Sequence, residues 1–268
     1  MHARPVFRQE TSITTSVGVG RPETLQVEIR RVPATRAVEW LNRGWEDLKR
    51  IGRPGLAHGA LIAILGAVLL ALGSTHMYLT AAAITGYLLV GPVMTTGLCE
   101  LARRRETREP LGFDESLQAV TRNPDGLLHF GAILALIALL WFVLSAILLE
   151  SVLSASVPSL AVALWGGASM LTSSQLLGYV VCGGVLAAIV FALSVVSVPL
   201  IIDRHASASD AMRASLRVTA ANLPAMVVWA GLIAGLTAIG FLTLLIGMVV
   251  VAPLLGYATW HAYRDLIA

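Results

Sequence analysis

Residues 127–149 read LLHFGAILALIALLWFVLSAILL, a run without aspartate, glutamate, lysine or arginine. A helix that crosses a bilayer needs about 20 consecutive apolar residues, so this stretch predicts a transmembrane helix. The chain of 268 residues agrees, because 56% of its residues are hydrophobic and only 13% are charged. Soluble proteins average about 25% charged residues. The composition excludes a soluble globular protein and predicts an all-α, polytopic membrane helix bundle.

Apolar stretches on both sides of this one complete a set of six predicted transmembrane helices. They cover about residues 56–73, 77–98, 127–149, 176–202, 225–240 and 242–262. The last two come from one almost uncharged run, which is too long for a single crossing and is divided near Gly240. These spans belong to a membrane domain at 36–266. Residues 1–35 are rich in Ser, Thr, Arg and Pro and are expected to form a disordered cytoplasmic tail.

The basic residues all fall on one side of this scheme. Ten of the 19 lysines and arginines precede the first span, and the others follow spans two, four and six. Cytoplasmic loops carry the excess of Lys and Arg. We therefore expect a multi-pass protein of the bacterial inner membrane with both termini in the cytoplasm. On the opposite side, loop 150–175 is expected to hold a short interfacial or re-entrant element.

The segments before spans three and five share a pattern. Residues 116–124 (SLQAVTRNP) and 215–224 (SLRVTAANLP) each predict a short amphipathic helix that Asn and Pro close before the membrane. Segment 36–50 has the same plan, with Trp40 and Trp45 expected at headgroup level. The second span of each pair also carries a proline that is expected to kink it: Pro92, Pro199 and Pro253. The sequence thus predicts three parallel two-helix repeats, each preceded by a cytoplasmic amphipathic helix.

Three stretches carry a family resemblance. They are GYLLVGPVMTTGLCELARRRE (86–106), SVPLIIDRHASASDAMRASLRVTAAN (197–222) and a Gly-x-Ala-Thr-Trp-His-Ala-Tyr-Arg motif (256–264). These stretches resemble a family of uncharacterised bacterial integral membrane proteins, classed as a domain of unknown function. The family commonly has Tyr at the position of Cys99, which argues against a required thiol.

A more distant similarity concerns Pro199, Asp203, Arg204, Ala211 and Ser215. This pattern resembles the membrane domain fused to some glycerophosphodiester phosphodiesterases, in which the membrane part is not catalytic. Together the two resemblances imply a six-helix membrane domain without an established activity.

Polar side chains gather at the predicted cytoplasmic ends of the spans. The candidate site for structural contacts, partners or lipids consists of Glu100, Arg103, Asp203, Arg204, His261, Tyr263, Arg264 and Asp265. For Asp203 and Arg204 three interpretations stay open: a structural ion pair, solvation of the helix end, or a lipid phosphate site. No metal is expected, because the histidines are scattered and none repeats at i, i+4. No catalytic residue or cofactor is expected either, since Asp203, His205 and Ser215 lack the surroundings of a hydrolytic triad.

The centres of the predicted spans carry no ionisable side chain, where ion-coupled transporters usually place one. The leading hypothesis is a non-catalytic assembly, scaffold or lipid-interacting membrane module that acts through its cytoplasmic face. Its expected partners are membrane lipids with anionic headgroups, and other membrane proteins or a second copy of the chain, but not nucleic acid. The alternative is a carrier or channel for a neutral or weakly polar solute. A membrane-embedded lipid enzyme is a third hypothesis.

Overall fold

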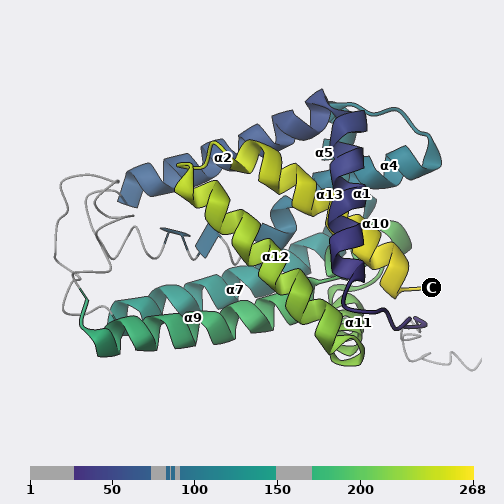
Figure 1. Cartoon of the computed structure of the whole chain (residues 1–268). Coiled ribbons are helices and arrows are strands. Elements are labelled where there is room, and N and C mark those ends of the chain that lie inside the picture. The colour runs from purple at the N-terminus through teal and green to yellow at the C-terminus, as the bar shows by residue number, and fades with distance from the viewer. Residues whose placement is uncertain (1–26, 74–82, 85, 88–90, 149–170) are drawn as a thin grey trace, which may run out of the picture.

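The computed structural model describes residues 27–73, 83, 84, 86, 87, 91–148 and 171–268, and helices dominate them (Figure 1). In chain order the helices are α1 (Arg36–Ile51), α2 (Arg53–Gly73), α4 (Thr96–Thr107), α5 (Phe113–Leu117), α6 (Ala119–Arg122), α7 (Pro124–Leu148), α9 (Ser173–Ser194), α10 (Ser197–Arg204), α11 (Ala208–Ala221), α12 (Leu223–Leu242) and α13 (Met248–Leu266). In this part of the chain the only β pairing is an isolated bridge between Ile29 and Ile267. The all-α class is confirmed.

Four of the described helical segments are long and apolar enough to cross a membrane. They are Arg53–Leu72, Pro124–Leu148, Ser173–Arg204 and Leu223–Leu242, which correspond to the predicted first, third, fourth and fifth spans. The predicted sixth span corresponds to α13, which is not among these four. The predicted second span, 77–98, and the element expected in loop 150–175 fall partly outside the described residues. Six crossings therefore stay a prediction.

The predicted fourth span is interrupted in the structure. Helix α9 ends at Ser194, Val195 and Val196 form a turn, and α10 begins at Ser197. Proline has no N–H to donate and its ring clashes with the carbonyl four residues earlier. For Pro199 that carbonyl belongs to Val195, which explains why the helix breaks at this point.

The connection between α12 and α13 differs slightly from the predicted division at Gly240. The chain turns at 243–247, where Leu244 and Leu245 adopt positive φ angles of 51° and 69°. Gly240 instead lies in the last turn of α12, where a Cβ atom would come within 2.3 Å of the Met248 sulfur. The glycine therefore serves the close packing of the hairpin and does not end the helix.

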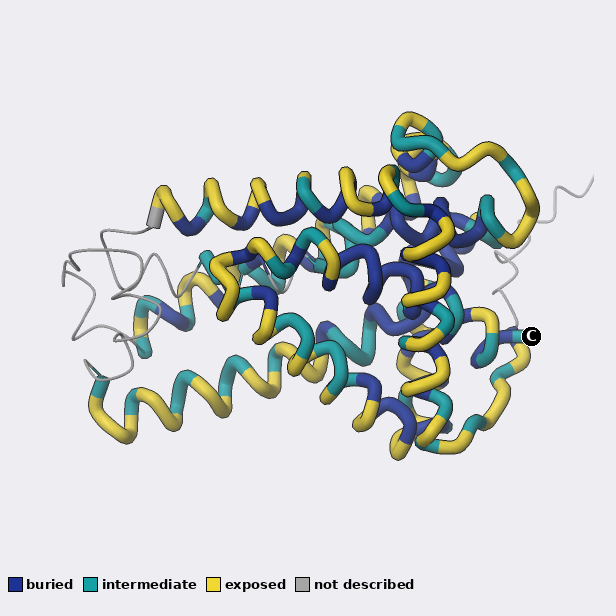
Figure 2. Tube along the Cα trace, turned by 45° about the horizontal axis from the view of Figure 1, so that its top comes forward, coloured by how far each residue is buried: buried dark blue, intermediate teal, exposed yellow. Residues whose placement is uncertain are grey.

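Helix α13 lies at the centre of the described structure and packs against α1, α2, α4 and α12. Glycines let the backbones approach closely, as is usual for helices packed in membranes. A Cβ atom on Gly44 of α1 would lie 2.8 Å from the Leu254 oxygen and the Ala258 nitrogen of α13. Buried residues accordingly concentrate where these helices meet, while the far ends of α7 and α9 are mostly exposed or intermediate (Figure 2).

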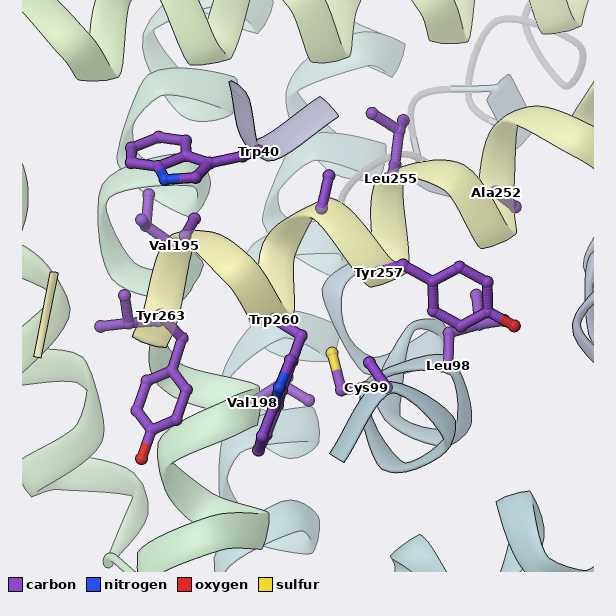
Figure 3. Packing of buried hydrophobic residues seen from close by; sticks show 14 of the residues in the cluster. Trp40, Leu98, Cys99, Val195, Val198, Ala252, Leu255, Tyr257, Trp260 and Tyr263 are labelled. Atoms are coloured by element: carbon purple, nitrogen blue, oxygen red, sulfur yellow. The ribbon is translucent and has the colours of Figure 1, made fainter. Parts of the chain in front are cut away.

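The core around α13 also includes residues of α4 and α10. Figure 3 shows Leu98 and Cys99 of α4 and Val198 of α10 facing Tyr257 and Trp260 of α13. All five side chains are buried. The ends of α4, α10 and α13 therefore form one packed unit, and we call the end of the bundle that holds this unit, together with α1, α5, α6 and α11, the polar end.

The amphipathic helices of the polar end contact the long helices in a cyclic order. Helix α5 packs on α2 and α4, α11 packs on α7, α9 and α10, and α1 packs on α12 and α13. Helices α5 and α11 thus pack on the long helices that precede them in the chain. Helix α1, which no long helix precedes, packs on the last two, α12 and α13. Three successive units would produce this order, although the repeat itself stays a prediction.

Two expectations for the amino-terminal region can be compared with the structure. Trp40 is fully buried, and its ring packs edge-on against the Trp229 ring with 5.8 Å between the ring centroids. The predicted place of Trp40 at headgroup level is therefore wrong. Trp45 is 44% exposed. Residues 27–35 were assigned to a tail that is expected to be disordered; in the structure the Arg30 N–H donates to the Leu266 carbonyl at 2.9 Å and Ile29 pairs with Ile267.

Candidate functional site

A buried carboxylate organises the first part of the polar end. Glu100 in α4 is fully buried and accepts hydrogen bonds from Arg103 and Arg104, at 2.9 and 2.8 Å. Arg122 of α6 lies 3.7 Å from the same carboxylate and donates from Nε to the Ile202 carbonyl. A carboxylate without water needs such charged donors. Glu100 and Arg103 are therefore brought together as a structural network that ties α4 to α6 and α10.

Glu109 completes this network from the exposed side. Arg103 donates two hydrogen bonds of 2.8 Å to its carboxylate, and Thr107 donates a third. These hydrogen bonds, with that of Arg103 first, lower the pKa of Glu109 to about 2. Glu109 therefore stays ionised throughout the physiological range.

Asp203 and Arg204 have separate partners. The Tyr263 hydroxyl donates to Asp203 at 2.6 Å, and Arg204 donates to the backbone carbonyl of Ala268 at 2.5 Å. The two residues therefore form no ion pair with each other within the described structure, and each instead bonds the end of α10 to the C-terminal segment. The lipid phosphate site stays a prediction.

Asp265 is the acceptor for three donors on α1. Its carboxylate accepts from Arg36 Nε at 2.8 Å, Trp40 Nε1 at 2.9 Å and Arg43 at 3.2 Å. Burial alone would raise the pKa of Asp265, but the hydrogen bonds from Trp40 and Arg43 outweigh it and hold that pKa below its usual range. The indole N–H of Trp40 finds its partner here, which is why a tryptophan expected at the headgroups is buried inside.

Two asparagines join distant segments. Asn123 donates to the carbonyls of Ile201 and Ala206, at 3.3 and 2.9 Å. Asn222 accepts from the Val32 N–H at 2.8 Å and donates to the Arg30 carbonyl at 3.1 Å. Both occupy the position that the sequence pattern assigned to the end of an amphipathic helix. Their contacts across the fold were not predicted.

Helices α1, α4 and α13 enclose a hollow of about 340 Å³ at the polar end, the candidate site. Asp47, Ala102 and Trp260 form its buried floor, since each is at most 2% exposed. Arg105 and His261 form its walls, and Arg43, Glu106 and Arg264 form its more exposed rim.

The side chains of this hollow are linked in pairs. Asp47 contacts Arg105 and lies 3.0 Å from Nε2 of His261. Glu106 accepts a hydrogen bond from Trp260 Nε1 at 2.9 Å and forms an ion pair with Arg264 at 2.9 Å. The hollow is therefore polar and held in shape by contacts that cross between three helices.

Of the predicted site residues, only His261 and Arg264 line this hollow. Arg43, Asp47, Arg105, Glu106 and Trp260 were not in the predicted set. For Arg43 and Asp47 the sequence did contain a signal, since an arginine and a carboxylate four residues apart share one face of the amphipathic helix at 36–50. The described residues contain no group of three or more His, Cys, Asp or Glu that could hold a metal ion.

Four apolar helices that carry exposed leucine, isoleucine and valine define a helical integral membrane protein. Comparison with protein families agrees. The model of a family described as predicted integral membrane protein (DUF2189) matches residues 79–203, slightly under half of the chain. No curated protein and no solved structure matches the chain. The family match supports a membrane domain of unknown function, and it ends before the C-terminal motif at 256–264.

Proposed function

We propose that this protein is a non-catalytic membrane module whose polar end faces the cytoplasm and binds anionic lipid headgroups. The observation that carries the proposal is the unequal distribution of charges at this end. Two carboxylates, Asp47 and Glu100, lie inside and are neutralised by arginines of the same chain, and among the exposed side chains of the described residues the basic ones outnumber the acidic ones.

Asp47 and Glu100 show the first half of this distribution, because both are buried and paired with arginines. The exposed basic residues of the described part are Arg30, Arg31, Lys49, Arg50, Arg53, Arg108, Arg213, Arg217 and Arg264. A basic residue near an anionic membrane surface contributes about 1 kcal/mol. The polar end exposes these residues. If it lies next to the headgroups, it therefore binds anionic lipids more strongly than uncharged ones.

Exposed apolar side chains accompany the basic ones on the amphipathic helices. Trp45 is exposed and Lys49 lies 5.4 Å from its ring centroid. Leu117 and Val120 are exposed beside α6, and Leu216 is exposed beside Arg217 on α11. Basic helices with apolar side chains on the lipid side are typical of the membrane interface. The pattern supports a polar end that touches the bilayer surface.

The orientation in this proposal depends on the positive-inside rule. The bridge between Ile29 and Ile267 places segment 27–35 and the C-terminus at the same end of the bundle. If that end is cytoplasmic, both termini are on the cytoplasmic side of the bacterial inner membrane.

The experiment measures which lipids remain bound to the full chain. The protein is purified gently from membranes of mixed phosphatidylethanolamine and phosphatidylglycerol, and the retained lipids are quantified by native mass spectrometry. The double variant Arg50→Gln/Arg53→Gln should lower the retained ratio of phosphatidylglycerol to phosphatidylethanolamine by about fivefold for each charge at low ionic strength. The control Glu46→Gln alters an exposed residue of opposite sign on α1, the helix that carries Arg50, and should not lower this ratio.

An unchanged lipid ratio in the double variant would contradict the proposal. A protein partner that co-purifies reproducibly would indicate the assembly or scaffold role instead. Solute flux into proteoliposomes would indicate the carrier or channel. These outcomes separate the three functions because each has its own readout.

A further inference from the structure

The hollow between α1, α4 and α13 has the chemistry of an oxyanion site. Three guanidinium groups reach it from three different helices: Arg43 from α1, Arg105 from α4 and Arg264 from α13. Arginine is the side chain best suited to phosphate, because its planar fork donates two parallel hydrogen bonds. The volume of the hollow, about 340 Å³, lies in the range of small-ligand pockets.

The carboxylates that line the hollow are already engaged. Asp47 is held by Arg105 and His261, and Glu106 is held by Trp260 and Arg264. These contacts direct the carboxylate oxygens to side chains of the walls and rim. The lining thus holds three guanidinium groups against two carboxylates, and Arg43 is itself paired with Asp265, which is not part of the lining.

The arginines retain donors after these contacts. A guanidinium group has five N–H donors. Among the contacts of the described residues, Arg264 uses Nη2 toward Glu106 and Arg105 uses Nη1 toward Asp47. The Nε and the other Nη nitrogen of both side chains are left for a ligand in the hollow.

We infer that this hollow binds a phosphate group, supplied by a phospholipid headgroup or by a soluble phosphate. Arg105 and Arg264 donate to its oxygens, whereas Arg43 stays paired with Asp265. In its lipid form the inference rests on the proposed function, whereas the soluble form does not.

The test uses the full chain and two probes. Purified protein in a phosphate-free detergent micelle is titrated with inorganic phosphate by calorimetry, and separately with short-chain phosphatidylglycerol. Arg264→Gln is the main variant, because Arg264 and its partner Glu106 are about half exposed and the change leaves the buried Asp47 paired. Arg108→Gln is the matched control, since Arg108 is an exposed arginine just beyond α4 that does not line the hollow.

The expected result is saturable binding that Arg264→Gln weakens by about tenfold, or 1.4 kcal/mol. Arg108→Gln should leave the binding of inorganic phosphate unchanged, and it should weaken the binding of phosphatidylglycerol by no more than one surface charge contributes, about fivefold. Binding of inorganic phosphate would identify a soluble ligand, and binding of phosphatidylglycerol alone would identify a lipid. If Arg264→Gln does not fold, Ala102→Val narrows the floor without a change of charge and should also weaken binding. Binding of neither probe, or equal loss in Arg108→Gln, would overturn the inference. The lipid ratio governed by Arg50 and Arg53 is measured separately, so the two proposals can fail independently.

Discussion

Replacement of Glu100 by glutamine tests whether the buried network holds the polar end together. The Glu100 carboxylate is fully buried and faces Arg103, Arg104 and Arg122. Glutamine has nearly the same shape but no charge. The substitution therefore leaves these guanidinium groups with less compensation while the packing of α4 is kept.

The magnitude follows from the partners that remain. Removal of one member of a buried ion pair costs about 3–5 kcal/mol. Arg103 keeps its two hydrogen bonds to Glu109, and Arg104 keeps one to Gln118. We therefore expect Glu100→Gln to lower the free energy of unfolding by an amount at the lower limit of this range, about 3 kcal/mol. With roughly 2–4 °C per kcal/mol for a chain of this size, the melting temperature should fall by about 6–12 °C.

The assay is thermal unfolding of the purified protein in detergent, followed by intrinsic tryptophan fluorescence. Trp260 is suited to it because it is buried in the core of the polar end and faces Cys99, the residue that precedes Glu100 (Figure 3). Glu46→Gln removes an exposed carboxylate and is the control. A melting temperature for Glu100→Gln within 2 °C of the control, a margin set at roughly 1 kcal/mol, would refute the reasoning.

Three further predictions concern other parts of the fold. The hydrogen bonds from Arg103 and Thr107 lower the pKa of Glu109 from 4.5 to about 2. This carboxylate therefore stabilises the protein above pH 4.5, and its contribution is lost as the pH falls toward 2. Glu109→Gln should reduce the fall in melting temperature between these two pH values. Gly44→Ala should destabilise the protein by about 1–3 kcal/mol, because its Cβ atom would lie 2.8 Å from backbone atoms of α13, and unfolding in detergent measures this. Asn222→Ala removes the hydrogen bonds that hold segment 27–35, so limited trypsin digestion should cleave this segment several times faster.

Each of these predictions has an outcome that would contradict it. Identical pH profiles for the wild type and Glu109→Gln would show that this carboxylate does not contribute. For Gly44→Ala the control is Gly231→Ala, because a Cβ atom at Gly231 meets no atom within 4 Å, and equal stability of the two variants would count against the close approach of α1 and α13. Unchanged trypsin kinetics in Asn222→Ala would mean that the contacts of Ile29 and Arg30 with the C-terminus suffice to hold the segment.

The long helices were predicted well because hydropathy is a property of consecutive residues. Stretch 127–149 corresponds to α7, and the helix predicted at 36–50 corresponds to α1. Helix ends were less well predicted. The break before Pro199 had a visible cause, but the turn at 243–247 contains two leucines with positive φ, which no sequence rule favours.

The candidate site was predicted only in part, since its members come from segments far apart in the chain. His261 and Arg264 were expected at the polar end, and both line the hollow. Asp47 and Trp260 line it because α1 lies against α13 and α4, a contact between residues separated by about 200 positions in the chain. Nothing in the local pattern of segment 36–50 states which helix will cover its apolar face.

The sequence by itself determined that the chain is an α-helical membrane protein with its charges gathered at one end, because hydrophobicity and charge need only be summed along consecutive residues. The tertiary structure alone decided that Trp40 lies inside, that Asp265 gathers donors from α1, and that segment 27–35 pairs with the C-terminus. These outcomes depend on how closely two helices can approach and on which buried polar atom finds a partner. Gly44, whose position allows α1 to meet the backbone of α13, is an example of the first, and Asp265, which accepts from Trp40, is an example of the second.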